Sequence, residues 1–168
     1  MPSPRFKSQV LEVPPAAPEV ARAHFAGKLA LETDPSDLHF DLTHGIEGLV
    51  VVDARGKDAY ADRHVPGALN LPYPTLSPET VAPLRGQTVV VYCWSASCNA
   101  GTKAAARLAA LGVPVKELLG GLAAWEEEGY PTEGALDPAV AFQDYLRYHH
   151  RDPRGPMSAR GPEGQPRR

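Results

Sequence analysis

The sequence contains little of what a disulfide-stabilised or membrane-spanning protein needs. Only two of its 168 residues are cysteines, Cys93 and Cys98, and two cysteines so close together make a poor disulfide framework. No apolar run approaches the length of a transmembrane helix, and Met1 to Pro4 is not followed by the apolar core of a signal peptide. We therefore expect a protein of the reducing cytoplasm.

An excess of charge of one sign is also missing. The formal net charge is -3, which provides no electrostatic footprint for nucleic acid or for an acidic membrane surface. Neither partner is expected. A composition of 43% hydrophobic and 22% charged residues suits one soluble domain with a proper core.

The composition changes along the chain and predicts four segments. Prolines dominate the first residues, and Pro, Gly and Arg dominate the last ones. The predicted segments are an N-terminal arm with a short helix (1–27), the main domain (28–134), a C-terminal helix (135–150) and a disordered tail (151–168). At the first boundary we expect a helix over 19–25, ended by Gly27, and a short strand over 28–32.

Strand and helix patterns alternate through the main domain. Valine-rich runs at 49–52 and 89–91 indicate strands buried on both faces, and 102–111 is strong helix material that ends at Gly112. Asp34 and Pro35 are typical of a helix start, and Ser77 predicts another. The alternation predicts an α/β fold with a mostly parallel sheet covered by helices on both faces.

Cys93 lies two residues after the second valine run, where a strand gives way to a loop and a helix. Backbone N–H groups of such a loop and the positive end of the helix dipole lower the pKa of a thiol, and the thiolate is the nucleophile. A buried cysteine that acts as a small apolar residue is the alternative. The position alone favours neither interpretation.

Three other polar residues are candidates for the same edge of the sheet. Asp53 and Arg55 end the first valine strand, and carboxyl ends of parallel strands meet at one edge. Their simplest role is a structural salt bridge that fixes a loop. His64 lies beside a turn and is more typical of a hydrogen-bonded structural histidine than of a general base.

Four ordered motifs together resemble the rhodanese homology domain. They are Val51-Val52-Asp53-Ala54-Arg55, His64-Val65-Pro66-Gly67-Ala68-Leu69-Asn70, Val90-Val91-Tyr92-Cys93 and Leu119-Gly120-Gly121-Leu122-Ala123-Ala124-Trp125. The resemblance implies a five-stranded parallel sheet and a single-domain, thiosulfate sulfurtransferase type of enzyme. In such an enzyme, Cys93 forms a persulfide and moves sulfane sulfur from a donor such as thiosulfate to a thiophilic acceptor.

The resemblance also implies the partners and the site. The partners are a small sulfur donor and a thiol or cyanide acceptor, with a sulfur-relay protein as a further candidate; no cofactor and no metal are implied. Cys93 is the predicted catalytic residue. The predicted active-site loop is Trp94, Ser95, Ala96, Ser97, Cys98, Asn99 and Ala100, supported by Asp53, Arg55, His64 and Lys103.

The loop after Cys93 departs from the family pattern. Many active members carry a Gly and then an Arg there, whereas this loop is about two residues longer and has no cation, since Lys103 lies within the helix. Related phosphatases use Cys-x5-Arg, and Asn99 stands where that arginine would be. A phosphatase is therefore a weaker alternative.

Two further alternatives and one open question remain at this point. A non-enzymatic rhodanese-like binding module would be marked by a missing cysteine, and Cys93 is present. A metal site from Cys93 and Cys98 with His64 or His149-His150 lacks fixed ligands. Cys98 either simply lines the loop or attacks the Cys93 persulfide to close a disulfide.

Overall fold

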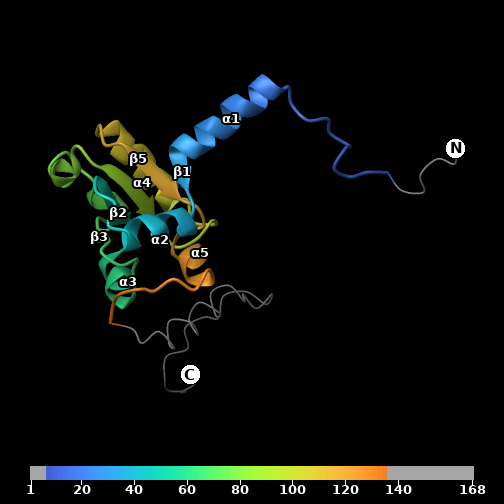
Figure 1. The fold of residues 1–168 in the computed structure, drawn as a ribbon. Coiled ribbons are helices and arrows are strands. Elements are labelled where there is room, and N and C mark those ends of the chain that lie inside the picture. Colours follow the sequence, from blue (N-terminus) through green and yellow to red (C-terminus); the bar gives the residue numbers. More distant parts are fainter. Residues whose placement is uncertain (1–6, 136–168) are drawn as a thin grey trace, which may run out of the picture.

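The computed structural model describes residues 7–135, which form one five-stranded parallel sheet with helices on both faces (Figure 1). The strand order is β1-β5-β4-β2-β3, and every pairing is parallel. The predicted α/β fold is confirmed. The strands are β1 (Glu32–Thr33), β2 (Leu49–Asp53), β3 (Leu69–Asn70), β4 (Thr88–Tyr92) and β5 (Val115–Leu118).

Of the helices, one precedes the first strand, one follows the last strand, and the others connect consecutive strands. The helices are α1 (Pro18–Leu31), α2 (Pro35–Thr43), α3 (Lys57–Asp62), α4 (Ala100–Ala110) and α5 (Gly121–Glu127), with two short 3-10 helices, Tyr73–Thr75 and Ala82–Leu84. The predicted start of α2 is confirmed, because the Asp34 carboxylate accepts the Asp37 N–H at 2.8 Å and Pro35 is the first helical residue.

Alternate residues of the valine strands enter two separate cores. Val52, Val89 and Val91 pack with Ala104 and Leu108 of α4 on one face. The opposite face is a second cluster, formed by Leu38, Val51, Val65, Ala68, Val90, Tyr92, Leu118, Leu122 and Trp125. Because both faces are covered, β2 and β4 consist almost entirely of apolar residues.

The register of the central strands places their carboxyl ends side by side. β2 and β4 pair along their full length, so Asp53 lies opposite Tyr92, and Asn70 of β3 lies opposite Asp53. Cys93 is the first residue after β4. The sheet edge therefore presents Cys93 beside the polar ends of two neighbouring strands.

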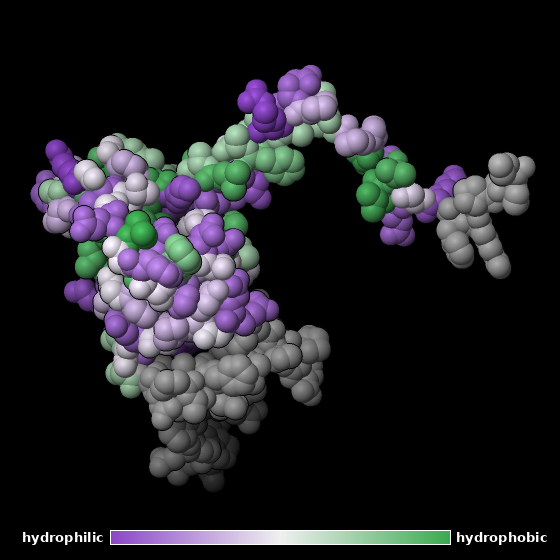
Figure 2. Space-filling model, viewed as in Figure 1, coloured by the Kyte–Doolittle hydropathy of each residue, from purple (hydrophilic) through white to green (hydrophobic). Residues whose placement is uncertain are grey.

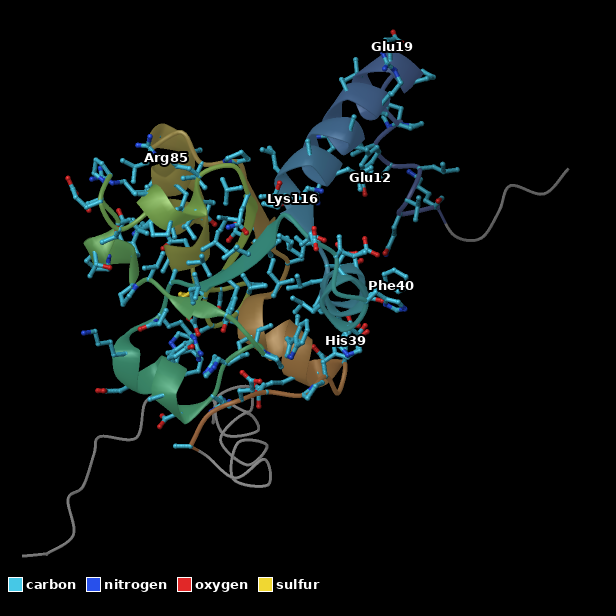
Figure 3. All side chains as sticks on the ribbon, turned by 60° about the vertical axis from the view of Figure 1, so that its left-hand side comes forward. Glu12, Glu19, His39, Phe40, Arg85 and Lys116 are labelled. Atoms are coloured by element: carbon cyan, nitrogen blue, oxygen red, sulfur yellow. The ribbon has the colours of Figure 1, made fainter. Side chains whose placement is uncertain are left out.

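The helix end predicted at Gly27 is wrong. The helix α1 continues through Gly27 to Leu31, and the strand expected over 28–32 is reduced to the two residues of β1. One glycine costs a helix only about 1 kcal/mol. Lys116 offsets part of that cost, because its Nζ donates to the Leu29 carbonyl at 2.9 Å near the end of α1 (Figure 3).

The helix α1 extends away from the sheet and buries none of its residues (Figure 1). Its apolar side chains remain at the surface, and they appear green along the projecting helix in Figure 2. Among them, Phe25 is 61% and Leu29 74% exposed. The domain that holds the site thus owes little of its core to α1.

Other predictions on the chain ends and connections have mixed outcomes. The helix expected to begin at Ser77 is wrong: residues 77–81 form turns, and the 3-10 helix begins at Ala82. Apart from Ala135, the predicted C-terminal helix (135–150) and tail (151–168) lie outside the described residues. Within residues 7–135 no helix is long and apolar enough to cross a membrane.

Candidate active site

A buried ion pair lies directly beneath the loop that follows β4. The Asp53 side chain is fully buried, and Arg55 is 3% exposed. Arg55 Nη2 donates to Asp53 Oδ2 at 2.6 Å, and Arg55 Nε donates to Asp53 Oδ1 at 3.0 Å. Charges this deep are costly unless their hydrogen bonds are made within the protein, and here Arg55 Nη1 is left without a partner.

Tyr92 links this ion pair to the strand that carries Cys93. Its hydroxyl donates to Asp53 Oδ2 at 2.7 Å and accepts the Val65 N–H at 3.1 Å. Burial and the nearby Asp53 charge raise the pKa of Tyr92, so the hydroxyl stays protonated and remains a donor. Arg55 Nη2 also donates to the Arg63 carbonyl at 2.6 Å. The network therefore joins β2, β4 and the segment 63–65.

The loop after Cys93 turns back and brings its second cysteine to the first. The Cys98 N–H donates to the Ser95 carbonyl at 2.9 Å, which closes a turn. The sulfur atoms of Cys93 and Cys98 then lie 3.0 Å apart, with both thiols free. Cys93 is buried, whereas Cys98 is half-buried.

The expectation that this loop lowers the pKa of Cys93 is wrong for the free protein. Burial, together with the hydrogen bond to Cys98, raises the pKa of Cys93 to about 12, although the Trp94 N–H and the Arg55 charge oppose the shift. For Cys98, burial is outweighed by the hydrogen bond from Cys93, the N–H groups of Ala100 and Trp94, and the Lys103 charge, which lower its pKa. The start of α4 therefore favours a thiolate at Cys98, not at Cys93.

The first residues of α5 form backbone hydrogen bonds with the Cys93 loop. The N–H of Leu122 donates to the Cys93 carbonyl at 3.0 Å, and that of Ala123 donates to the Trp94 carbonyl at 2.9 Å. This approach requires Gly121, where φ is +61° and a Cβ would lie 2.5 Å from the Cys93 oxygen. Gly121 thus allows the Cys93 loop to pack directly against the start of α5.

A cavity of about 260 Å³ opens beside the two sulfur atoms. Its lining includes Cys93, Ser95, Ala96, Ser97, Cys98 and Asn99 of the predicted loop. The only charged residues that line it, among the described residues, are Glu32 and Glu117. Neither was predicted from the sequence, because Glu32 of β1 and Glu117 of β5 become neighbours only through the strand order.

The remaining predicted site residues lie around the cavity without lining it. The Trp94 ring lies over the Arg55 guanidinium, 4.3 Å from ring centroid to Cζ. His64 stacks on Tyr60 and its Nδ1 lies 2.7 Å from the Tyr60 carbonyl, which is a structural position. Ala100 is the first residue of α4, and Lys103 follows one turn later.

No group of three or more His, Cys, Asp or Glu side chains within residues 7–135 is arranged to hold a metal ion. The pair His149-His150, considered above as a ligand source, lies outside the described residues.

Residues 41–128 match the family model of the rhodanese-like domain, which is more than half of the chain. The chain belongs to the rhodanese-like domain family. The match spans the ion pair, the Cys93 loop and α5, and it includes every cavity-lining residue except Glu32.

Individual rhodanese-like and related proteins show how far this similarity extends. A crystal structure from Bacillus halodurans is 41% identical, with a TM-score of 0.70, and covers 71% of this chain and 88% of that one. A thiosulfate sulfurtransferase from Pseudomonas aeruginosa is 29% identical, with a TM-score of 0.53, over 71% of this chain and 26% of that one.

A curated relative, an uncharacterized protein from Synechocystis, is 33% identical over 87 residues, which are 51% of this chain and 48% of the relative. The chain thus spans about half the length of this relative.

The close approach at Gly121 can be tested against a matched glycine. Gly121→Ala should lower the free energy of unfolding by about 2–4 kcal/mol, because it combines a left-handed backbone with a clash against the Cys93 carbonyl. Gly129→Ala has a similar φ of +78° in open space and should cost only about 1–2 kcal/mol. Urea unfolding measures both, and equal losses would show that the contact with Cys93 is unimportant.

The pKa directions predict which thiol reacts first with an alkylating agent. At pH 7, limiting iodoacetamide should modify Cys98 at least about tenfold faster than Cys93, because the thiolate is the reactive form. Raising the pH deprotonates Cys93 and should narrow the difference. Tandem mass spectrometry of the peptide assigns the modified residue, with the urea-unfolded chain as the equal-rate control. Faster modification of Cys93 at pH 7 would contradict the assignment.

Proposed function

We propose that the chain is a sulfurtransferase that carries sulfane sulfur on Cys93. The observation that supports this most strongly is the position of Cys93, buried at the end of β4 and opening onto a cavity in a rhodanese-like domain. A covalent sulfur carrier needs a thiol, space for one added sulfur atom and a donor site, and this edge of the sheet offers all three.

The first half-reaction requires a Cys93 thiolate, and Cys98 is placed to generate it. Its sulfur lies 3.0 Å from that of Cys93 and favours the thiolate in the free protein. As a donor approaches, the proton moves from Cys93 to Cys98, and the Cys93 sulfur attacks the outer sulfur of the donor. With thiosulfate, the S–S bond breaks, sulfite leaves with the electron pair, and a Cys93 persulfide remains.

The second half-reaction returns Cys93 to its starting state. A thiophilic acceptor such as cyanide or a thiol attacks the outer sulfur of the persulfide, and the Cys93 thiolate leaves. Because Cys93 is buried, the outer sulfur in the cavity is the more accessible of the two persulfide sulfur atoms. The cycle needs reduced thiols, in keeping with the cytoplasmic setting expected from the sequence.

The cavity does not favour phosphoryl transfer. That chemistry relies on cations that stabilise the charge spread over the phosphoryl oxygens. Asn99 occupies the place of the phosphatase arginine, and the charged side chains that line the cavity, among the described residues, are carboxylates. Sulfur transfer to a soft nucleophile needs no such cation.

Substitution of the carrier cysteine tests the proposal. Cys93→Ser should reduce sulfite release from thiosulfate, with cyanide or a small dithiol as acceptor, by about 1000-fold or more, because a hydroxyl cannot carry sulfane sulfur. The thermal unfolding midpoint of the variant should stay close to that of the wild type. Sulfite release that survives Cys93→Ser but not Cys98→Ser would make Cys98 the carrier.

The two cavity carboxylates predict that a dianionic donor is disfavoured. Glu117→Gln retains an acceptor for the Thr102 hydroxyl, which donates to Glu117 Oε1 at 3.0 Å, but removes one negative charge. We expect kcat/KM for thiosulfate to rise about threefold to tenfold at low salt, and the gain to shrink as salt screens the charge.

Two controls accompany this measurement. Glu128→Gln lies on the surface away from the cavity and should leave kcat/KM unchanged. An uncharged organic polysulfide should be used equally well by wild type and Glu117→Gln. A similar gain with the uncharged donor would show that the effect of Glu117 is not electrostatic.

A further inference from the structure

The two sulfur atoms at the cavity support a second reaction that starts from the Cys93 persulfide. They lie 3.0 Å apart in the reduced chain, and a disulfide has an S–S distance of about 2.05 Å. Closure therefore needs a movement of about 1 Å. The turn that joins Ser95 to Cys98 holds Cys98 close to Cys93.

Cys98 is better placed than any external thiol to attack the inner sulfur of the persulfide. The inner sulfur of a persulfide on Cys93 is buried, since Cys93 is only 6% exposed. An external thiol is thus restricted to the outer sulfur in the cavity, whereas Cys98 is already in contact with the inner one. Intramolecular attack of this kind gains from a high effective concentration.

The surroundings of Cys98 keep it reactive after Cys93 has taken up sulfur. The hydrogen bond from the Cys93 thiol is then lost, whereas the Ala100 N–H and the Lys103 charge remain and act to lower the pKa of Cys98 against the effect of its burial. Both groups belong to α4. Cys98 can therefore act as the nucleophile of a second step.

We propose that Cys98 attacks the inner sulfur of the Cys93 persulfide, so that the chain reduces sulfane sulfur to sulfide and closes a Cys93–Cys98 disulfide. The proposal rests on the persulfide of the proposed function. The step converts the Cys93 persulfide anion and the Cys98 thiol into the disulfide and hydrosulfide: a Cys98–Cys93 bond forms, and the persulfide S–S bond breaks. The leaving sulfur takes that electron pair and the proton of Cys98. The sulfane sulfur is reduced, and the two cysteine sulfur atoms are oxidised.

A dithiol closes this cycle. It reduces the Cys93–Cys98 disulfide by exchange and becomes a disulfide itself, which returns both cysteines to thiols. With thiosulfate as donor, the full cycle converts thiosulfate and a dithiol into sulfite, sulfide and an oxidised dithiol. The acceptor class assigned to the chain is therefore a dithiol.

A single-turnover experiment without reductant or acceptor tests the proposal. The full chain is mixed with excess thiosulfate, and intact mass and free sulfide are followed. Wild type should lose about two mass units and release about one sulfide per chain. Cys98→Ser lacks the base that deprotonates Cys93, so it is incubated for longer and at raised pH; it should then gain about 32 mass units, the mass of one sulfur atom, and release no sulfide. Cys93→Ser should do neither, and circular dichroism verifies that both variants are folded.

The outcomes distinguish the role proposed for Cys98 from the proposed sulfurtransferase function. A wild-type chain that keeps the added sulfur mass, as Cys98→Ser does, would overturn the role of Cys98 and leave Cys93 as a carrier. The same result follows if Cys98 only takes the outer sulfur, because the mass then stays raised. If neither wild type nor Cys98→Ser gains sulfur or releases sulfide, the proposed sulfurtransferase function itself fails.

Discussion

The buried ion pair of Asp53 and Arg55 is the constraint on which the geometry of this edge depends. Two charges removed from water require their hydrogen bonds within the protein, and these partners come from different segments. Asp53 binds the Tyr92 hydroxyl, Arg55 binds the Arg63 carbonyl, and the Asn70 amide donates to the Arg55 carbonyl at 2.9 Å. The hydrogen bonds made by these two charges therefore join the ends of β2 and β4 to the segment 63–65 and fix the position of the residue that follows Tyr92, although Arg55 Nη1 is left without a partner.

The proposed chemistry depends on how this position affects the ionisation of two thiols, Cys93 and Cys98. Burial at the strand end makes Cys93 hard to ionise, while the start of α4 makes Cys98 easier to ionise. With 3.0 Å between their sulfur atoms, a proton can pass from one thiol to the other. In the proposed mechanism Cys98 supplies both a base and a second nucleophile. The turn from Ser95 to Cys98 is what returns Cys98 to Cys93.

The sequence is sufficient for the features that depend on local patterns. The two valine runs, the Asp34 cap and the glycine at the end of α4 each act through neighbours in the chain, and all appear in the structure. The error in the predicted helix end at Gly27 has a different cause. A glycine is a weak helix signal, and the contact from Lys116 to the end of α1 lies 87 residues away in the chain.

The parts of the site that escaped prediction depend on long-range packing. Glu32 and Glu117 pair across neighbouring strands, so their place at the cavity requires the strand order and register. The raised pKa of Cys93 comes mainly from burial, which no local motif reports. The sequence therefore identifies Cys93 as a candidate by its residue type and position. It does not reveal the burial and the charges that surround Cys93.

The central claim is that Cys93 carries sulfane sulfur, and the most direct measurement is to locate the transferred atom. Thiosulfate with an isotopic label in its outer sulfur is reacted with Cys98→Ser, and the trapped persulfide is assigned by tandem mass spectrometry. The account predicts that the label is attached to Cys93 and that the released sulfite carries none. A label that remains in the released sulfite, or a chain that binds no label, would contradict it.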